Sequence, residues 1–125
     1  MRVVIQRVSH ANVKIEGKEV GSIQTGLLLL LGVSPADSKD DIDYLIKIIT
    51  NMRIFSDEEG KMNLSVLDIK GELLIISQFT LHASTKKGNR PSFINAAKPD
   101  IANKLYLDFI TAAKTAIGKY QVATG

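Results

Sequence analysis

The sequence of 125 residues contains no cysteine and only two histidines. Without cysteine the chain forms no disulfide and offers no thiolate as a nucleophile, an Fe–S ligand or a zinc ligand. Neither His10 nor His82 has a second histidine at the spacing of a metal-binding motif. We therefore predict no metal site and no cofactor.

Long apolar runs are also missing. The longest one, Leu27–Val33, is far shorter than the roughly 20 residues that span a bilayer, and Gln6 and Arg7 interrupt any signal peptide at the start. We expect a cytoplasmic protein with no membrane partner. The glycines form neither GxxxxGK[ST] nor GxGxxG, so nucleotide binding of these two types has no support.

The composition is that of one globular domain. Hydrophobic residues make up 45% and charged residues 23% of the chain, close to the averages for such proteins, and the length suits a single domain over residues 1–125. The formal charge of +3 is small. It allows an anionic partner without requiring one.

Hydrophobic periodicity predicts an α+β (mixed α/β) fold. Alternating apolar residues over 1–24 indicate strands, and the apolar run Leu27–Val33 indicates a central strand. Apolar residues at helical spacing predict two amphipathic helices, at about 38–53 and 99–117. Residues 72–81 read as a further strand, and the segment after Gly118 as the entry to a strand that does not follow. Two helices packed on a sheet are the expected arrangement.

The predicted strand 72–81 changes from apolar to polar near its end, where Ser77, Gln78, Phe79 and Thr80 follow one another. Polar groups at the carboxyl end of a buried strand often line a ligand pocket. The alternative is that the three polar side chains face solvent at the rim of the sheet while Phe79 enters the core. The pattern itself leaves both interpretations open.

Three further features each allow a functional and a structural interpretation. Ser77 as a nucleophile has little support, because it lacks a GxSxG motif and His82 would lie about 16 Å along an extended strand. The cations Lys86, Lys87 and Arg90 indicate either a phosphate-binding loop or an ordinary solvated one. Arg7, in the first strand, could extend to solvent or donate to backbone carbonyls.

Several segments together resemble the D-aminoacyl-tRNA deacylases, formerly called D-tyrosyl-tRNA deacylases. They occur in that family's order and cover nearly the whole chain. They are MRVVIQRV at the start, GLLLLLGV at 26–33, MRIFSDEEGKMNLSV at 52–66, GELLIISQFTL at 71–81, KKGNRPSF ending at Phe93, and LYLDF at 105–109. SQFTL followed within about ten residues by GNRPSF is the most specific of these signals.

The resemblance implies a homodimeric enzyme with the family's barrel-like sheet, which hydrolyses the ester between a D-amino acid, or glycine mischarged on tRNA-Ala, and the 3′-terminal adenosine of tRNA. It places Ser77, Gln78, Phe79 and Thr80 in the catalytic pocket. The backbone N–H groups of Phe79 and Thr80 would face the scissile ester, and water would attack with help from the ribose 2′-OH. Ala102 matches a position where a small side chain leaves room for the adenosine.

The sequence departs from the pattern of this family at one motif. The family carries a Gly-Pro pair in a C-terminal segment that enters the partner subunit's pocket and excludes L-amino acids, and Arg7 matches the residue that holds this segment. The present sequence contains no Gly-Pro pair, so we expect a single deacylase domain without that segment. The alternative function is a non-catalytic tRNA-binding or dimerisation module of the same fold, inactivated by truncation. An unrelated hydrolase using Ser77 is a third alternative.

Overall fold

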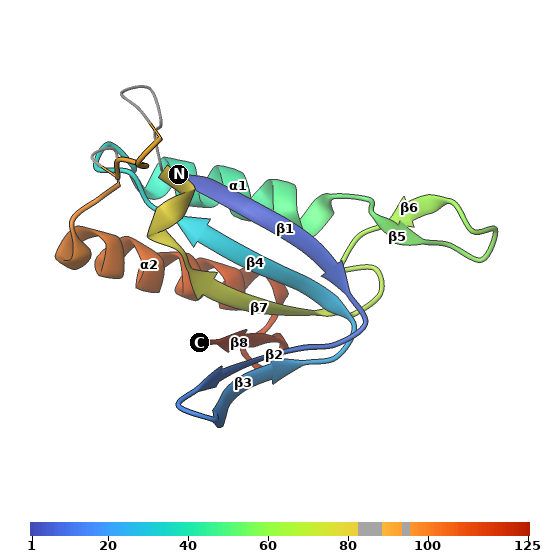
Figure 1. Ribbon diagram of the computed structural model, residues 1–125. Coiled ribbons are helices and arrows are strands. Elements are labelled where there is room, and N and C mark those ends of the chain that lie inside the picture. Colours follow the sequence, from blue (N-terminus) through green and yellow to red (C-terminus); the bar gives the residue numbers. More distant parts are fainter. Residues whose placement is uncertain (83–88, 94–95) are drawn as a thin grey trace.

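The computed structural model describes residues 1–82, 89–93 and 96–125. The main sheet has four strands in the order β1-β4-β7-β8 (Figure 1). These strands are β1 (Arg2–Val8), β4 (Gly26–Gly32), β7 (Glu72–Ser77) and β8 (Val122–Thr124). β1 runs antiparallel to β4, whereas β4, β7 and β8 are mutually parallel. The prediction of a central strand at 27–33 is confirmed, since β4 lies between β1 and β7.

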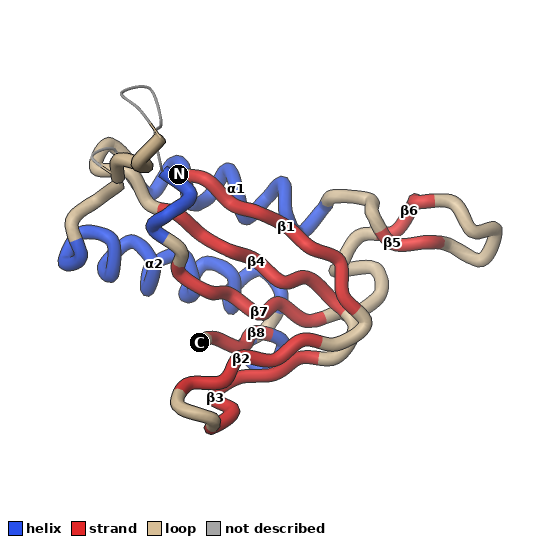
Figure 2. The backbone as a smooth tube through the Cα atoms, in the orientation of Figure 1, coloured by secondary structure: helices blue, strands red, loops and turns tan. Residues whose placement is uncertain are grey.

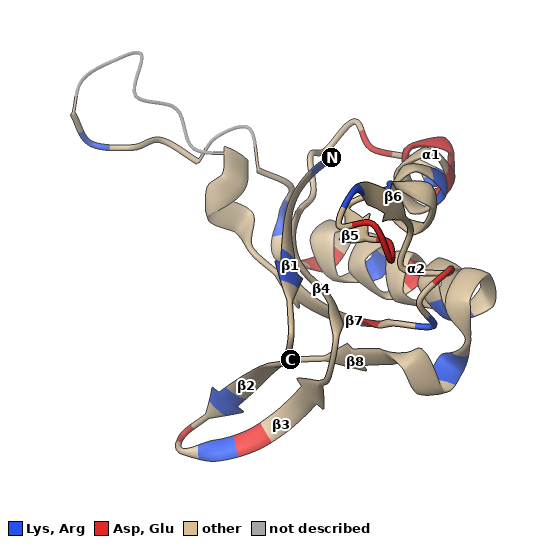
Figure 3. Ribbon diagram, turned by 90° about the vertical axis from the view of Figure 1, so that its right-hand side faces the viewer, with Lys and Arg blue, Asp and Glu red and all other residues tan. Residues whose placement is uncertain are grey.

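Both helices cover the same face of this sheet (Figure 3). They are α1 (Lys39–Asn51) and α2 (Pro99–Ile117). The second matches its predicted range, whereas α1 is shorter than the predicted 38–53. Ser38 is the N-cap, its backbone N–H donating to the Asp41 carboxylate at 2.9 Å, and Met52 is already extended. The α+β architecture with two amphipathic helices is confirmed.

Two hairpins flank the sheet (Figure 2). The first joins β2 (Ala11–Ile15) to β3 (Lys18–Ile23), and the second joins β5 (Phe55–Ser56) to β6 (Met62–Leu64) around a turn that carries Asp57, Glu58 and Glu59. The first hairpin lies against β8, because a Cβ on Gly21 would lie 2.5 Å from the Thr124 carbonyl oxygen. The β2–β3 hairpin thus packs beside β8 as a separate two-stranded sheet.

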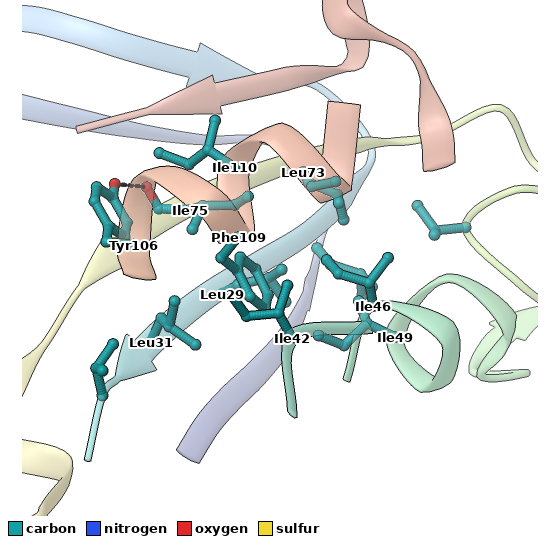
Figure 4. Packing of buried hydrophobic residues seen from close by; sticks show 14 of the residues in the cluster. Leu29, Leu31, Ile42, Ile46, Ile49, Leu73, Ile75, Tyr106, Phe109 and Ile110 are labelled. Carbon is teal, nitrogen blue, oxygen red and sulfur yellow. Dashed lines mark hydrogen bonds between the residues drawn. The ribbon is translucent and has the colours of Figure 1, made fainter. Parts of the chain in front are cut away.

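The core lies between the sheet and the helices (Figure 4). Alternate residues of β4 and β7 face the helices, which is the period of two that strands impose. The most deeply buried members are Leu27, Leu29 and Leu31 of β4, Leu73 and Ile75 of β7, Ile42 and Ile49 of α1, Phe109 and Ala113 of α2, and Val66 between β6 and β7. Burial of each large side chain stabilises the fold by about 1.5–3 kcal/mol.

Two predictions about strands are corrected by the structure. The last strand does form, as the three-residue β8, which pairs with Leu73–Ile75. The predicted strand 72–81 is wrong beyond Ser77, where the chain turns into a 3-10 helix at Phe79–His82 (the 3-10 turn). β8 extends only to the partner of Ile75, and β4 ends at Gly32. Among the described residues, no strand pairs with the backbone beyond Gln78.

Candidate active site

A pocket of about 630 Å³ lies where β7 ends and α2 begins. Its size is typical of small-ligand sites, and it occupies the carboxyl end of a parallel strand pair, where ligands often bind in α/β sheets. The residues that line it are Ser77, Phe79, Phe93, Ala96, Ala97, Pro99, Ala102, Asn103 and Tyr106.

The strand-end residues Ser77 and Phe79 form one wall. The side chain of Phe79 is 57% exposed and packs edge-on against Phe93, with ring centroids 5.1 Å apart and an interplanar angle of 71°. Phe79 therefore lines the pocket and does not enter the core. The alternative of a solvated rim with Phe79 buried is therefore wrong about Phe79, whereas Ser77 and Thr80 are exposed as it expected.

The backbone N–H groups of Phe79 and Thr80 follow the last ladder bond of β7. That bond runs from the Gln78 N–H to the Leu31 carbonyl at 2.7 Å, and the next backbone bond runs from the Leu81 N–H to the Gln78 carbonyl at 3.4 Å. Within the described part of the chain, neither the Phe79 nor the Thr80 N–H has a backbone acceptor. This is the expected state of the first N–H groups of a helix, which have no partner inside it.

The side chains of Gln78 and Thr80 bind each other at the pocket's edge. The Gln78 amide nitrogen donates to the Thr80 hydroxyl oxygen, and neither residue lines the pocket. The four consecutive residues singled out in the sequence thus divide into two that line the pocket and two that fix the turn beside it.

Helix α2 supplies the opposite wall, including Ala102 and Asn103. Tyr106, one turn further along, is buried, and its hydroxyl donates to the Ile75 carbonyl at 2.8 Å (Figure 4). Burial raises the pKa of this phenol above its ordinary value of 10.0. Tyr106 therefore ties α2 to β7 two residues before Ser77.

We expect Tyr106→Phe to lower the free energy of unfolding by about 1–2 kcal/mol at pH 7, because the Ile75 carbonyl loses its buried donor. The raised pKa means that the folded state holds its proton at pH values where the unfolded chain releases it. This contribution is complete below pH 10 and declines as the pH rises through the folded-state pKa. Urea unfolding at pH 7 and pH 11 checks the prediction: the gap between wild type and variant should shrink at pH 11, and an unchanged gap contradicts it.

The predicted cations are not all brought to the pocket. Lys86 and Lys87 lie outside the described residues. Arg90 is exposed, three positions before the pocket residue Phe93. Arg7 pairs with Leu27 of β4, whereas Ser77 pairs with Leu31, and four strand residues span about 13 Å.

Arg7 instead holds a connection near the other end of the sheet. Its Nη1 donates to the Ile54 carbonyl at 2.6 Å. Of the two interpretations drawn for this side chain, donation to a backbone carbonyl is confirmed. The structure does not bring Arg7 into the pocket of its own chain.

His82 ends the 3-10 turn and lies in the interior, 6% exposed. Because the chain turns after Ser77, the separation expected along an extended strand does not apply. His82 does not line the pocket, and its Nε2 has no hydrogen-bond partner among the described residues. The arrangement gives no support to a Ser77–His82 nucleophile pair.

Sequence patterns missed most of the wall opposite Ser77. Phe93, Ala96, Ala97, Pro99 and Asn103 carry no local signal of a site, since small, apolar and amide side chains are common in any loop or helix. Phe93 and Tyr106 do lie within the family-like segments GNRPSF and LYLDF, and these segments were the available signal.

Other features of the described residues do not compete with this pocket. A second cavity of about 600 Å³ lies between α1 and α2, but it contains none of the residues selected from the sequence. No group of three or more His, Cys, Asp or Glu side chains in the described segments could hold a metal ion. Neither helix described here has the length and apolar character needed to cross a membrane.

Fold and pocket together define an α+β domain with a ligand site at the end of a parallel strand pair. Comparison with known proteins narrows this class. The family model described as D-Tyr-tRNA(Tyr) deacylase matches residues 4–125. The D-aminoacyl-tRNA deacylase of Thermosipho africanus is 61% identical over 114 residues, which is 91% of this chain and 76% of that protein. The D-aminoacyl-tRNA deacylase of Bacteroides fragilis is 58% identical over all 125 residues, which is 83% of that protein.

Solved structures agree with this result. The c-Myc DNA Unwinding Element Binding Protein superimposes with a TM-score of 0.95 at 34% identity, covering all of this chain and 84% of the other. A probable eukaryotic D-amino acid tRNA deacylase, with a TM-score of 0.77 at 20% identity over 93% of this chain and 68% of that one, shows the same fold. The chain belongs to the D-Tyr-tRNA(Tyr) deacylase family, which confirms the resemblance seen in its motifs.

Proposed function

We propose that the pocket between β7 and α2 is where this chain hydrolyses the ester bond of D-aminoacyl-tRNA. The reaction joins the oxygen of water to the carbonyl carbon and breaks that carbon's bond to the ribose 3′ oxygen, which takes up a proton. The products are the free D-amino acid and a tRNA with a free 3′-OH. Family membership supports the activity, and the chemistry of the pocket supports the location.

The observation that carries the mechanism is the absence of an acid–base side chain from the wall. Among the pocket-lining residues that the structure describes, Tyr106 alone titrates. A phenol is already neutral at pH 7, and burial raises the pKa of this one further. Its hydroxyl proton is already donated to the Ile75 carbonyl. The described part of the wall therefore offers no general base, which favours attack by water with the 2′-OH of the substrate's own ribose assisting.

The protein's contribution is then electrostatic. The Phe79 and Thr80 N–H groups, which lack backbone acceptors among the described residues, would donate to the oxyanion that develops on the ester carbonyl. Donors fixed in this way stabilise the transition state more than the ground state. Ser77 would line the pocket beside the ester, and Gln78 would hold the turn through its bond to the Thr80 hydroxyl.

The remaining predicted contacts concern the end of the tRNA. Ala102, a small side chain on the α2 wall, would leave room for the terminal adenosine. Arg90, exposed near Phe93, would bind a phosphate of the 3′ strand, since guanidinium forks match phosphate oxygens. Glycyl-tRNA mischarged on tRNA-Ala would also enter, because glycine is smaller than any D-amino acid. We place this activity in the cytoplasm, where aminoacyl-tRNA is made.

The face of the main sheet opposite the two helices favours a homodimer. Val4 pairs with Leu30, and Leu30 pairs with Ile76, so these three side chains share the face opposite the helices. Val4 is 48% exposed, and Leu30 and Ile76 are partly exposed. Contiguous apolar surface of this kind is commonly an interface. Because Arg7 lies away from the pocket of its own chain, it could support a site only in the partner subunit. Sedimentation equilibrium measures whether the protein is a dimer.

The decisive experiment follows amino-acid release from D-aminoacyl-tRNA and from the matching L-aminoacyl-tRNA. We expect hydrolysis of the D form. Hydrolysis of neither form supports the non-catalytic module instead. Hydrolysis of both retains the deacylase activity but rejects chiral selection by the residues present.

Thr80→Ala separates a hydroxyl nucleophile from a main-chain role. We expect less than about a tenfold loss of kcat, because the variant keeps the backbone N–H and loses only a side chain that lies outside the pocket wall. Steady-state kinetics with D-aminoacyl-tRNA measure the effect. Complete loss of hydrolysis with normal substrate binding would point to the hydroxyl as nucleophile.

A further inference from the structure

The carboxyl end of β4 anchors both walls of the pocket, although none of its residues lines the pocket. The Leu31 carbonyl accepts the Gln78 N–H at 2.7 Å, which fixes the start of the 3-10 turn. The Val33 carbonyl accepts the Ala97 N–H at 2.9 Å, which fixes the segment leading into α2. Leu31 near the end of β4 and Val33 just after it thus hold opposite walls.

Gly32, the residue between them, supports the turn by having no side chain. A Cβ at this position would lie 2.9 Å from Leu81 Cβ, 3.0 Å from His82 Cδ2 and 3.1 Å from the Gln78 carbonyl oxygen. The first and third of these atoms belong to the turn's backbone or lie next to it, so they cannot move away by side-chain rotation. The 3-10 turn therefore rests directly on the Gly32 backbone.

We propose that Gly32 is a positioning residue for the deacylase reaction, because its lack of a Cβ sets the placement of the Phe79 and Thr80 N–H groups. The inference rests on the proposed function of these amides. A side chain at position 32 pushes the turn outward by a few tenths of an ångström or more. Because oxyanion donors act only in a narrow range of geometry, such a shift lowers kcat far more than it raises KM.

Gly32→Ala and Gly71→Ala form a matched pair. A Cβ on Gly71 would meet Val66 Cγ2 at 2.9 Å, Ile69 Cδ1 at 3.1 Å and the Thr25 carbonyl oxygen at 3.1 Å. These distances match those at Gly32, although the first two atoms are side-chain ends. Gly71 precedes β7, at the end of the strand remote from the turn. Both variants crowd a buried glycine, but only Gly32→Ala displaces the 3-10 turn.

The experiment combines steady-state kinetics on D-aminoacyl-tRNA with amide ¹H–¹⁵N spectra of the wild type and both variants. We expect Gly32→Ala to lose about tenfold to a hundredfold in kcat with KM changed less than about twofold. Its Phe79 and Thr80 amide resonances should shift, whereas Gly71→Ala should keep both wild-type kcat and those resonances. Equal losses in the two variants, or a wild-type kcat in Gly32→Ala, overturn the inference while leaving the proposed function intact.

Failure of the proposed function and failure of the positioning role of Gly32 give different results. If the wild type hydrolyses no aminoacyl-tRNA, the proposed function fails, and unmoved Phe79 and Thr80 resonances in Gly32→Ala separately overturn the positioning role. If Gly32→Ala does not fold, the double variant Gly32→Ala/His82→Ala relieves the imidazole contact and keeps the crowding at Leu81 and Gln78. We expect this double variant to show the same loss in kcat and the same shifts of the Phe79 and Thr80 amide resonances when it is compared with His82→Ala alone.

Discussion

Phe79→Pro is expected to reduce kcat about a hundredfold to a thousandfold below that of Phe79→Ala. Both variants lose the ring that packs on Phe93, but only proline removes the backbone N–H. Loss of one oxyanion donor typically costs this much in acyl-transfer enzymes. The comparison therefore isolates the main-chain amide, which no ordinary side-chain substitution reaches.

The position should accept proline without unfolding. Phe79 is the first residue of the 3-10 turn, where a fixed φ and a missing N–H are tolerated. The Phe79 N–H has no backbone acceptor among the described residues, so proline removes no hydrogen bond of the sheet. The residue before a proline avoids helical backbone angles, and Gln78, which would precede it, lies outside the 3-10 turn. Circular dichroism confirms the fold, and steady-state kinetics give kcat. Equal kcat values for the proline and alanine variants would remove the Phe79 amide from the mechanism.

Ala102→Phe is expected to lower kcat/KM by about a hundredfold or more, chiefly through weaker substrate binding. Ala102 lines the α2 wall, so a benzyl group there would occupy the space that the proposed function assigns to the terminal adenosine. A single methylene can change discrimination tenfold or more in a fitted pocket, and a whole ring exceeds that. The effect should be similar for every aminoacyl group, because the adenosine is common to all of them.

Ile101→Phe is the matched control. It adds the same ring at the neighbouring position of α2, but Ile101 is 42% exposed and does not line the pocket. Its kinetics should stay within about twofold of wild type, since surface substitutions are usually mild. Wild-type kcat/KM in Ala102→Phe would show that the adenosine binds elsewhere.

Local patterns predicted the elements that are long and strongly periodic. The range of α2 and the central position of β4 followed from helical spacing and from a continuous apolar run, because these patterns already state which faces are buried. The family-like segments located the strand end at Ser77–Thr80, which the pattern alone left between a pocket and a solvated rim. The predicted end of β7 was several residues too late, since the residue types at 78–81 do not by themselves mark the end of a strand.

The sequence by itself determined the α+β class, the two helices, the family and the segment to which we assign the chemistry. Only the tertiary structure decided that this segment turns after Ser77 and presents two N–H groups that lack backbone acceptors among the described residues. It also brought Phe93 and the α2 wall opposite Ser77, and it placed Arg7 away from its own pocket. The reason is physical: whether a backbone N–H is paired depends on where the neighbouring strand ends, and the residues of β7 do not encode that β4 ends at Gly32.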